Sequence, residues 1–176
     1  ITAVLAADKT PLQRYPLNVI AAVEPAPNYL ITTAMQHVVR EGTGQAVYHV
    51  MPAEQTAAGK TGTTDDLRDS WFAGFTGDRL GVVWSGRDDN QPTGLTGSSG
   101  ALRIWRDVFA TSRGAGLQPP GADIEYHWID PLTGRLADES CVDAVQLPFK
   151  RGSAPTEQAP CAGRPRPIDW FEELFN

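Results

Sequence analysis

The sequence Ala58-Gly59-Lys60-Thr61-Gly62-Thr63-Thr64 carries the strongest local signal in the chain, because it sets one of only three lysines between two glycines and ahead of three threonines. We expect an extended strand here, with Lys60, Gly62 and Thr64 on one face and Thr61 and Thr63 on the other. Gly62 weakens a strand interior unless something must approach the backbone closely. Such a strand could pair its main chain with an extended peptide, while its ammonium and hydroxyl groups meet a terminal carboxylate.

Three interpretations of this stretch compete on the residues alone. A glycine-punctuated surface turn fits any bare Gly-Lys-Thr-Gly sequence, since short motifs match by chance. A phosphate-binding loop needs a glycine five positions before the Gly-Lys pair, and Glu54 stands there instead. The third interpretation is the Lys-Thr-Gly element of serine acyl-transferases that act on penicillins and D-alanyl peptides.

The segments that follow this stretch predict an antiparallel sheet. Residues 71–76 and 80–85 are strand-like, and Gly77-Asp78-Arg79 between them indicates a hairpin. Together with the strand at 58–64 they give three successive strands with short connections, which favours antiparallel pairing. A further short strand is expected at 46–51.

Two amphipathic helices should cover this sheet. The first follows the chain-breaking Pro25 and Pro27, is capped by Asn28 and stops at Gly42. Its apolar positions are 30, 31, 34, 35, 38 and 39. The second is capped by Ser98 or Ser99, and its apolar positions are 101, 102, 104, 105, 108 and 109. A sheet covered by two helices is an α+β arrangement.

The two ends of the chain predict smaller elements. Residues 1–5 and 12–17 should pair as a hairpin about a turn at 8–11. Glycines and prolines between 114 and 121 mark a change in composition, so we divide the chain into 1–117 and a C-terminal extension, 118–176. The extension should be partly β and partly irregular. Its expected elements are a strand at 124–129, a turn at 131–134, irregular chain at 152–163 and an amphipathic segment at 168–175.

The composition limits the possible partners. The 41% apolar and 20% charged residues are ordinary for a globular protein. A formal net charge of −6 argues against nucleic acid or an anionic membrane surface as main partner, since both favour basic patches. No apolar run is long enough to span a bilayer. The first residue is Ile1, so we expect the chain to begin inside a longer protein, with any targeting segment or anchor outside it.

The two cysteines, Cys141 and Cys161, lie among prolines, glycines and polar residues, a poor setting for buried free thiols. A disulfide is the favoured interpretation and implies an oxidising compartment. Two unpaired thiols in a reducing cell remain the alternative. A metal site is disfavoured because no second Cys or His pair accompanies these residues, and we predict no cofactor.

A series of further motifs resembles a known family. In order along the chain they are 29–44, Lys60–Thr64, Asp69–Gly74, Gly86–Thr93 and Gly97–Ala101. As a set they are similar to the end of the transpeptidase domain of bifunctional class A penicillin-binding proteins. The resemblance covers most of residues 1–117 and implies part of a penicillin-binding, β-lactamase-like fold. It also implies binding of β-lactams and of peptidoglycan stem peptides ending in D-Ala-D-Ala, at the periplasmic face of the bacterial inner membrane.

The same resemblance implies roles for the residues of the decisive stretch. Lys60 would assist proton transfer and attract the substrate carboxylate, and the hydroxyls of Thr61 and Thr63 would bind that carboxylate, with Thr64 beside them. The backbone N–H of Thr63 would be an oxyanion donor, a kind of contact worth roughly 3 kcal/mol in the transition state. Gly62 would let the strand and substrate lie close together.

The chain lacks the rest of such an active site. A serine acyl-transferase of this type needs Ser-x-x-Lys and Ser-x-Asn, but Ala6, Ala57 and Leu147 stand three places before the three lysines, and no serine precedes an asparagine by two. We therefore expect an inactive piece of a DD-transpeptidase whose parent is also a peptidoglycan glycosyltransferase and whose N-terminal part is this chain's partner.

Two alternatives stay open. One is a non-catalytic peptide- or partner-binding module, and the other is a relative of DD-carboxypeptidases or β-lactamases. If the helix with the nucleophile lies outside this chain, one face of the sheet should be uncovered. The residues at risk include Trp71, Phe75, Val82 and Trp84, and because side chains alternate along a strand only some of them should lie on that face.

Overall fold

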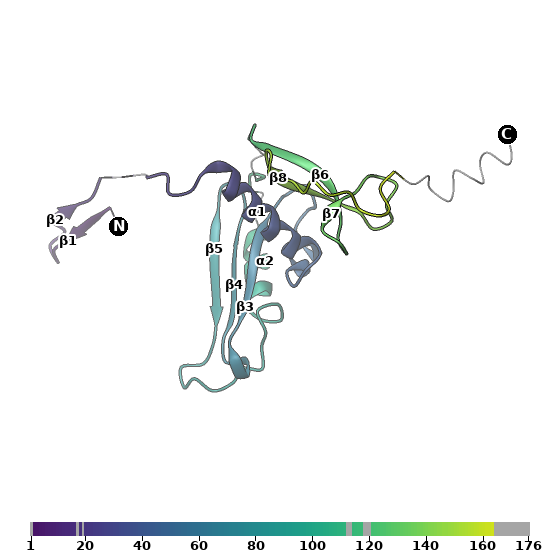
Figure 1. The fold of residues 1–176 in the computed structure, drawn as a ribbon. Coiled ribbons are helices and arrows are strands. Elements are labelled where there is room, and N and C mark those ends of the chain that lie inside the picture. Colours follow the sequence, from purple (N-terminus) through teal and green to yellow (C-terminus); the bar gives the residue numbers. More distant parts are fainter. Residues whose placement is uncertain (1, 17, 19, 112–113, 118–120, 164–176) are drawn as a thin grey trace.

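A three-stranded antiparallel sheet lies at the centre of the computed structural model, which describes residues 2–16, 18, 20–111, 114–117 and 121–163 (Figure 1). Its strands are β3 (Ala58–Thr63), β4 (Ser70–Phe75) and β5 (Leu80–Ser85), in the order β3-β4-β5. The turn between β4 and β5 is closed by a hydrogen bond from the Thr76 N–H to the Arg79 carbonyl at 2.8 Å. The predicted sheet and hairpin are confirmed.

One face of this sheet is covered by α2 (Ala101–Ala110). Phe72 of β4 is fully buried there and meets the Trp105 ring edge-on, with ring centroids 5.1 Å apart. Trp105 in turn stacks on Phe109 at 3.9 Å. These aromatic rings, with apolar side chains from the segments before β3, form the main hydrophobic core.

The other face of the sheet is open. Trp71, Val82 and Trp84 alternate with the buried positions and remain 42%, 59% and 46% exposed. Leu80 is also exposed at 74%. Phe75, the fourth of the residues at risk, is half-buried. The uncovered apolar face expected from the sequence is therefore present.

Helix α1 (Pro25–Arg40) lies beside β3 and begins earlier than the sequence suggested. Pro25 occupies the first turn, and Glu24, not Asn28, is the N-cap residue. Proline is tolerated at this position because the first N–H groups of a helix have no intrahelical partner, so reading Pro25 as a chain break was wrong. The predicted stop at Gly42 is confirmed, since its N–H reaches back to the carbonyls of His37 and Val38.

The predicted strand at 46–51 is a 3₁₀ helix, Gln45–His49. The chain turns back after α1 because the Gly44 N–H donates to the Val38 carbonyl at 2.9 Å. A helical turn then places both Val47 and Met51 in the core, where they are almost completely buried. Apolar burial of two residues four apart thus prevails over a weak strand pattern.

The start of α2 also differs from the prediction. Neither Ser98 nor Ser99 caps the helix, whose N-cap is Gly100 without a side-chain bond. Instead Ser70 of β4 accepts a hydrogen bond from the Ala101 N–H at 2.8 Å and donates one to the Thr96 carbonyl at 2.7 Å. A residue from the sheet therefore satisfies the helix terminus. Of the apolar positions in α2, 101, 102, 105 and 109 are buried, whereas 104 and 108 are exposed.

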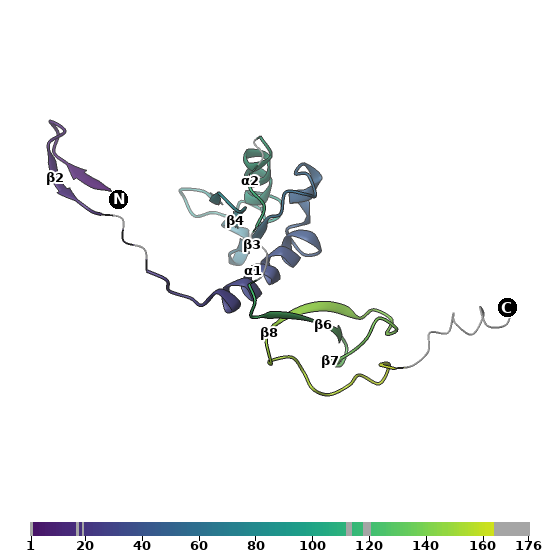
Figure 2. The same ribbon diagram turned by 90° about the horizontal axis from the view of Figure 1, so that it is seen from above.

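The N-terminal hairpin consists of β1 (Ala3–Leu5) and β2 (Pro11–Arg14), paired antiparallel as predicted. Figures 1 and 2 show it set apart from the sheet and from α1. Its apolar residues Val4, Leu5 and Leu12 are exposed.

The C-terminal extension forms a second antiparallel sheet, β7-β6-β8, from β6 (Ile124–Asp130), β7 (Arg135–Leu136) and β8 (Val145–Lys150). The predicted disulfide between Cys141 and Cys161 is present. Figure 2 shows α1 between the two sheets. The division at residue 117 stays a prediction, and the amphipathic segment at 168–175 lies outside the described residues.

The whole is a mixed α+β fold with small antiparallel sheets, as expected. Within the part of the chain that the structure describes, no helix has the length and apolar character needed to cross a membrane.

Candidate substrate-binding strand

Strand β3 carries Lys60 on the open face of the sheet. Its neighbours across the ladder are Ala73 for Lys60 and Trp71 for Gly62, so these residues share that face. The Lys60 side chain is exposed, and its Nζ donates to the Thr61 carbonyl at 2.8 Å. The ammonium group is thus held along the strand in a position that solvent can reach.

The hydroxyls of Thr61 and Thr63 are oriented by contacts with two other segments. Thr61 Oγ1 lies 2.7 Å from Thr43 Oγ1, in the turn after α1. Thr63 Oγ1 accepts a hydrogen bond from the Gly97 N–H at 2.9 Å. Because a hydroxyl both donates and accepts, the proton of Thr63 stays available for an acceptor such as a carboxylate.

A side chain at position 62 would be crowded by another residue of this chain. A Cβ at this position would stand 3.1 Å from the Cβ of Trp71, its cross-strand neighbour on the open face. On the other side, a Cβ at Gly97 would come within 2.7 Å of the Gly62 carbonyl oxygen. The glycine at position 97 therefore lets the loop before α2 lie directly on the backbone of β3.

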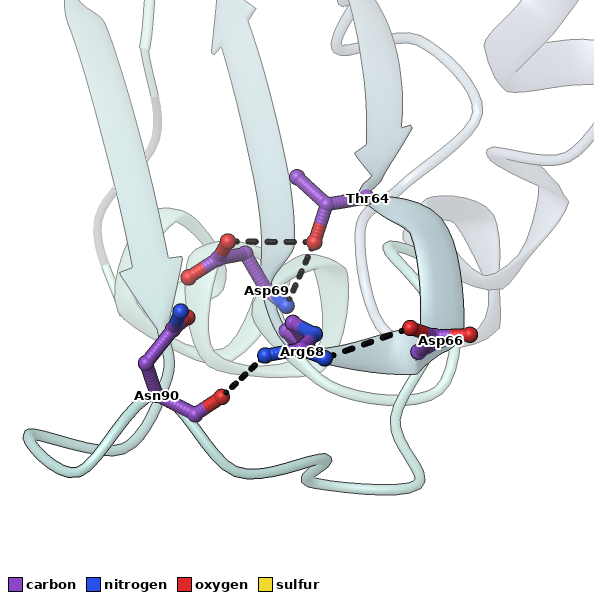
Figure 3. Close-up of polar contacts among 5 residues, drawn as sticks. All are labelled: Thr64, Asp66, Arg68, Asp69 and Asn90. Atoms are coloured by element: carbon purple, nitrogen blue, oxygen red, sulfur yellow. Dashed lines mark hydrogen bonds and ion pairs between the residues drawn. The ribbon is translucent and has the colours of Figure 1, made fainter.

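Thr64 lies just beyond the last residue of β3, so its placement on the strand was wrong. Its hydroxyl donates to Asp69 Oδ2 at 3.0 Å and accepts from the Asp69 N–H at 2.9 Å, as Figure 3 shows. The backbone N–H of Thr64 also donates to the Asp69 carbonyl at 3.2 Å. The only hydroxyl proton of Thr64 is therefore already used within the turn.

The turn that follows is tied to the loop at 86–100. Arg68 donates from Nη1 to the Asn90 carbonyl at 2.9 Å and from Nη2 to Asp66 Oδ2 at 3.3 Å (Figure 3). Thr93 reaches the Leu67 carbonyl with both its N–H and its hydroxyl, each at 2.8 Å. The bonds from Arg68 to Asn90 and from Thr93 to Leu67 join the turn at 65–68 to the loop at 86–100, whereas the bond to Asp66 stays within the turn.

An ion pair orders the same loop. The Arg87 guanidinium donates two hydrogen bonds to the Asp89 carboxylate, at 2.9 and 2.7 Å. Together with the Gln91 N–H, these bonds hold the pKa of Asp89 below its ordinary value. Asp89 is therefore an anion throughout the neutral range, where it serves the loop and does not titrate.

The structure thus brings Lys60, Thr61, Gly62 and Thr63 together on the more exposed half of β3 and places Thr64 in the turn that follows. Three contributors had no predicted role: Thr43, Asp69 and Gly97. They stand within quoted motifs, but their partners are up to 34 residues away in sequence. Among the described residues no group of His, Cys, Asp and Glu could hold a metal ion.

Comparison with known proteins gives close sequence relatives but no matching family model. The chain is 38% identical over 160 residues to Penicillin-binding protein 1B of Vibrio cholerae, a match that covers 90% of this chain and 20% of that protein. It is 50% identical over 76 residues to Penicillin-binding protein 1B of Haemophilus influenzae, covering 43% of this chain and 10% of that protein. The chain therefore spans about a fifth of the first of these relatives.

A solved structure shares the fold. The crystal structure of Penicillin-Binding Protein 1A from Haemophilus influenzae matches with a TM-score of 0.66 and 24% sequence identity. The match covers 76% of this chain and 21% of that protein chain.

Proposed function

Because the chain is homologous to a part of the class A penicillin-binding proteins, we propose that it is the C-terminal part of a transpeptidase domain in a bifunctional enzyme of that class. The observation that carries the proposal is a strand that presents a lysine and two oriented threonine hydroxyls. The chain that holds this strand is 38% identical to Penicillin-binding protein 1B of Vibrio cholerae over a match that covers 90% of this chain. In this proposal the parent protein cross-links peptidoglycan through an acyl-enzyme and binds β-lactams.

In the proposed site, an extended stem peptide ending in D-Ala-D-Ala lies along β3. The Lys60 ammonium attracts its terminal carboxylate and assists proton transfer, while the hydroxyls of Thr61 and Thr63 donate to the carboxylate. Gly62 leaves the strand backbone accessible to the peptide main chain. The Thr63 N–H stabilises the oxyanion, and the nucleophilic serine comes from outside this chain.

The open sheet face supports a larger folded unit. Trp71, Leu80, Val82 and Trp84 are all between 42% and 74% exposed, which is unusual for adjacent large apolar residues. We propose that the remainder of the same polypeptide covers this face, at the periplasmic side of the inner membrane. The parent would also carry the glycosyltransferase activity of bifunctional enzymes.

The test is covalent labelling by a fluorescent penicillin, read by intact-mass spectrometry. The chain alone should give no adduct, because it has no Ser-x-x-Lys serine. The full-length protein from the same gene should form one, and Lys60→Ala in it should slow labelling strongly. Lys150→Ala is the matched control, since it removes the same charge from an exposed side chain outside β3. An adduct on the isolated chain, or an unlabelled full-length protein, would overturn the proposal.

A non-catalytic peptide-binding module is the second candidate, and one observation favours it. The chain contains its own buried core around Phe72, Leu102 and Trp105. Light scattering separates the two candidates: a well-behaved monomer with a cooperative melt favours the module, whereas association through the open face favours a part of a larger domain. A relative that hydrolyses its acyl-enzyme, such as a DD-carboxypeptidase or β-lactamase, would release free acid in place of a cross-linked product.

A further inference from the structure

Asp69 stands where β3 ends and uses every polar group it has. Its carboxylate accepts from the Thr64 hydroxyl at 3.0 Å and from the Trp84 indole N–H at 2.8 Å. Its backbone N–H donates to the Thr64 hydroxyl at 2.9 Å, and its carbonyl accepts from the Thr64 N–H at 3.2 Å. Three of these four bonds therefore hold one residue, Thr64.

This placement matters because the ladder between β3 and β4 stops one residue earlier. Thr63 is opposite Ser70 in the last pair of the ladder, and a polar turn follows directly. Terminal residues of a strand have fewer backbone bonds to fix them and fluctuate more easily. The bonds between Thr64 and Asp69 continue the pairing by one step, so the Thr63–Thr64 peptide unit is held from both sides.

The indole of Trp84 fixes the carboxylate itself. Trp84 belongs to β5, and its ring lies 6.2 Å from that of Trp71 on the open face. With one oxygen bound to this indole and the other to Thr64, the Asp69 side chain cannot rotate without losing a bond. Rigid supporting contacts of this kind hold a site within the small tolerance that catalysis requires.

We propose that Asp69 is a positioning residue for the strand that binds substrate: by fixing Thr64 it orients the backbone N–H and hydroxyl of Thr63. This inference rests on the proposed function of that strand. It also gives Thr64 a role, since its hydroxyl proton is committed to Asp69 and Thr64 acts through the turn rather than by donating to the substrate.

The two hydrogen bonds that the Asp69 side chain accepts explain why a carboxylate is needed at this position. Both partners of the Asp69 carboxylate, the Thr64 hydroxyl and the Trp84 indole, are donors. An asparagine of the same shape has only one acceptor oxygen, so its amide would face one of these donors. Asp69→Asn therefore breaks one bond with little change in volume. Asp66→Asn is the matched control, because Asp66 lies in the same turn and its carboxylate binds Arg68.

The test uses the full-length protein and resolves acylation by a fluorescent penicillin into a dissociation constant and an acylation rate constant. An oxyanion contact acts in the transition state, so Asp69→Asn should lower the acylation rate constant and leave the dissociation constant nearly unchanged. We expect a loss of about tenfold, less than the ~100-fold that a displacement of 1 Å can cause. Asp66→Asn should behave as the wild type.

Thr64→Val provides the second arm. If Thr64 acts through Asp69, Thr64→Val should resemble Asp69→Asn, and the double variant should be no slower than either single one. If Thr64 instead binds the substrate directly, Thr64→Val raises the dissociation constant and its effect adds to that of Asp69→Asn. That result would overturn the inference.

Hydrogen exchange on the same proteins separates this inference from the proposed function. Asp69→Asn should raise deuterium uptake in peptides spanning 60–66 without changing the melting temperature, whereas Asp66→Asn should not. Wild-type acylation in Asp69→Asn, or unchanged uptake at 60–66, would overturn the positioning role. An unlabelled wild-type protein would instead overturn the proposed function, and the exchange data alone would then decide whether Asp69 holds Thr64.

Discussion

The body of the molecule, residues 25–117, and the C-terminal extension, residues 121–163, are stabilised by different means. In the body, Phe72, Leu102 and Trp105 are essentially removed from solvent within one continuous core. Among the described residues of the extension the buried apolar side chains are Ile129, Cys141 and Ala159. A segment this short cannot enclose a core of its own, so it depends on strand pairing and a covalent link.

The two regions meet at α1 through polar contacts. Tyr126 of β6 and Tyr29 of α1 share a hydrogen bond of 2.6 Å between their hydroxyls. The Lys150 ammonium lies 3.4 Å from the Glu24 carboxylate, an exposed pair of the kind that contributes little. From this difference we predict that the extension opens without unfolding the body, whereas damage to the body's core affects both.

The largest expected effect comes from the body's core. Phe72→Ala removes a fully buried ring that packs against Trp105, and such changes cost about 3–5 kcal/mol. Chemical denaturation followed by tryptophan fluorescence measures the loss. Phe149→Ala is the comparison in the extension, where the ring is only half-buried beside His127, and it should cost clearly less. Equal losses would remove the distinction between the two regions.

Next in size is the disulfide. Replacing Cys141 and Cys161 together by serine opens a loop with a sequence separation of 20. In the chain-entropy model a loop of this order contributes about 3 kcal/mol. We expect faster proteolysis and higher deuterium uptake within 121–163, with the body's protection unchanged. Simultaneous loss of protection around Phe72 would show that the two regions unfold as one.

A buried hydroxyl should have the next largest effect. Ser70→Ala leaves the Ala101 N–H and the Thr96 carbonyl without their partner in a fully buried site. Unsatisfied buried groups cost about 1–3 kcal/mol each. Ser99→Ala is the control, because Ser99 is one of the two caps that the sequence suggested and is only part-buried. A larger loss for Ser99→Ala than for Ser70→Ala would contradict the observed start of α2.

The hydrogen bond between Tyr29 and Tyr126, which links the body to the extension, should show the smallest effect. Tyr126→Phe removes one half-exposed hydrogen bond, worth about 0.5–1 kcal/mol. Burial raises the pKa of Tyr126 to about 12, and the bond to Tyr29 adds to the rise. The folded state thus favours the neutral phenol. The contribution of the Tyr126 hydroxyl to the stability of the folded state is complete below the ordinary pKa of 10.0 and is lost as the pH rises towards 12.

The measurement is the difference in stability between wild type and Tyr126→Phe across pH 9 to 12, followed by hydrogen exchange in 121–163. Using the difference removes the titration of the lysines, which both proteins share. The gap should narrow as the pH rises through this window. A stability difference that does not change with pH would mean that the Tyr126 hydroxyl does not stabilise the contact between the body and the extension.

Several elements followed from local pattern alone. The strands β3, β4 and β5 were predicted because each has a run of strand-forming residues bounded by turn residues, and the hairpin at 77–79 needs only its own glycine and aspartate. The disulfide followed from the surroundings of its two cysteines. Two of the failures are Pro25, which starts α1, and residues 46–51, where burial of Val47 and Met51 selects a helical turn.

The sequence by itself determined the α+β class, the sheet and the strand that presents Lys60, because periodicity and turn chemistry act between near neighbours. Only the tertiary structure decided what orients that strand. Ser70 and Ala101 are 31 residues apart, Gly97 and Thr63 are 34 apart, and Trp84 and Asp69 are 15 apart. A hydroxyl or carboxylate can bond to many groups, and the folded chain selects one partner by bringing distant backbone within about 3 Å. No local pattern encodes that choice.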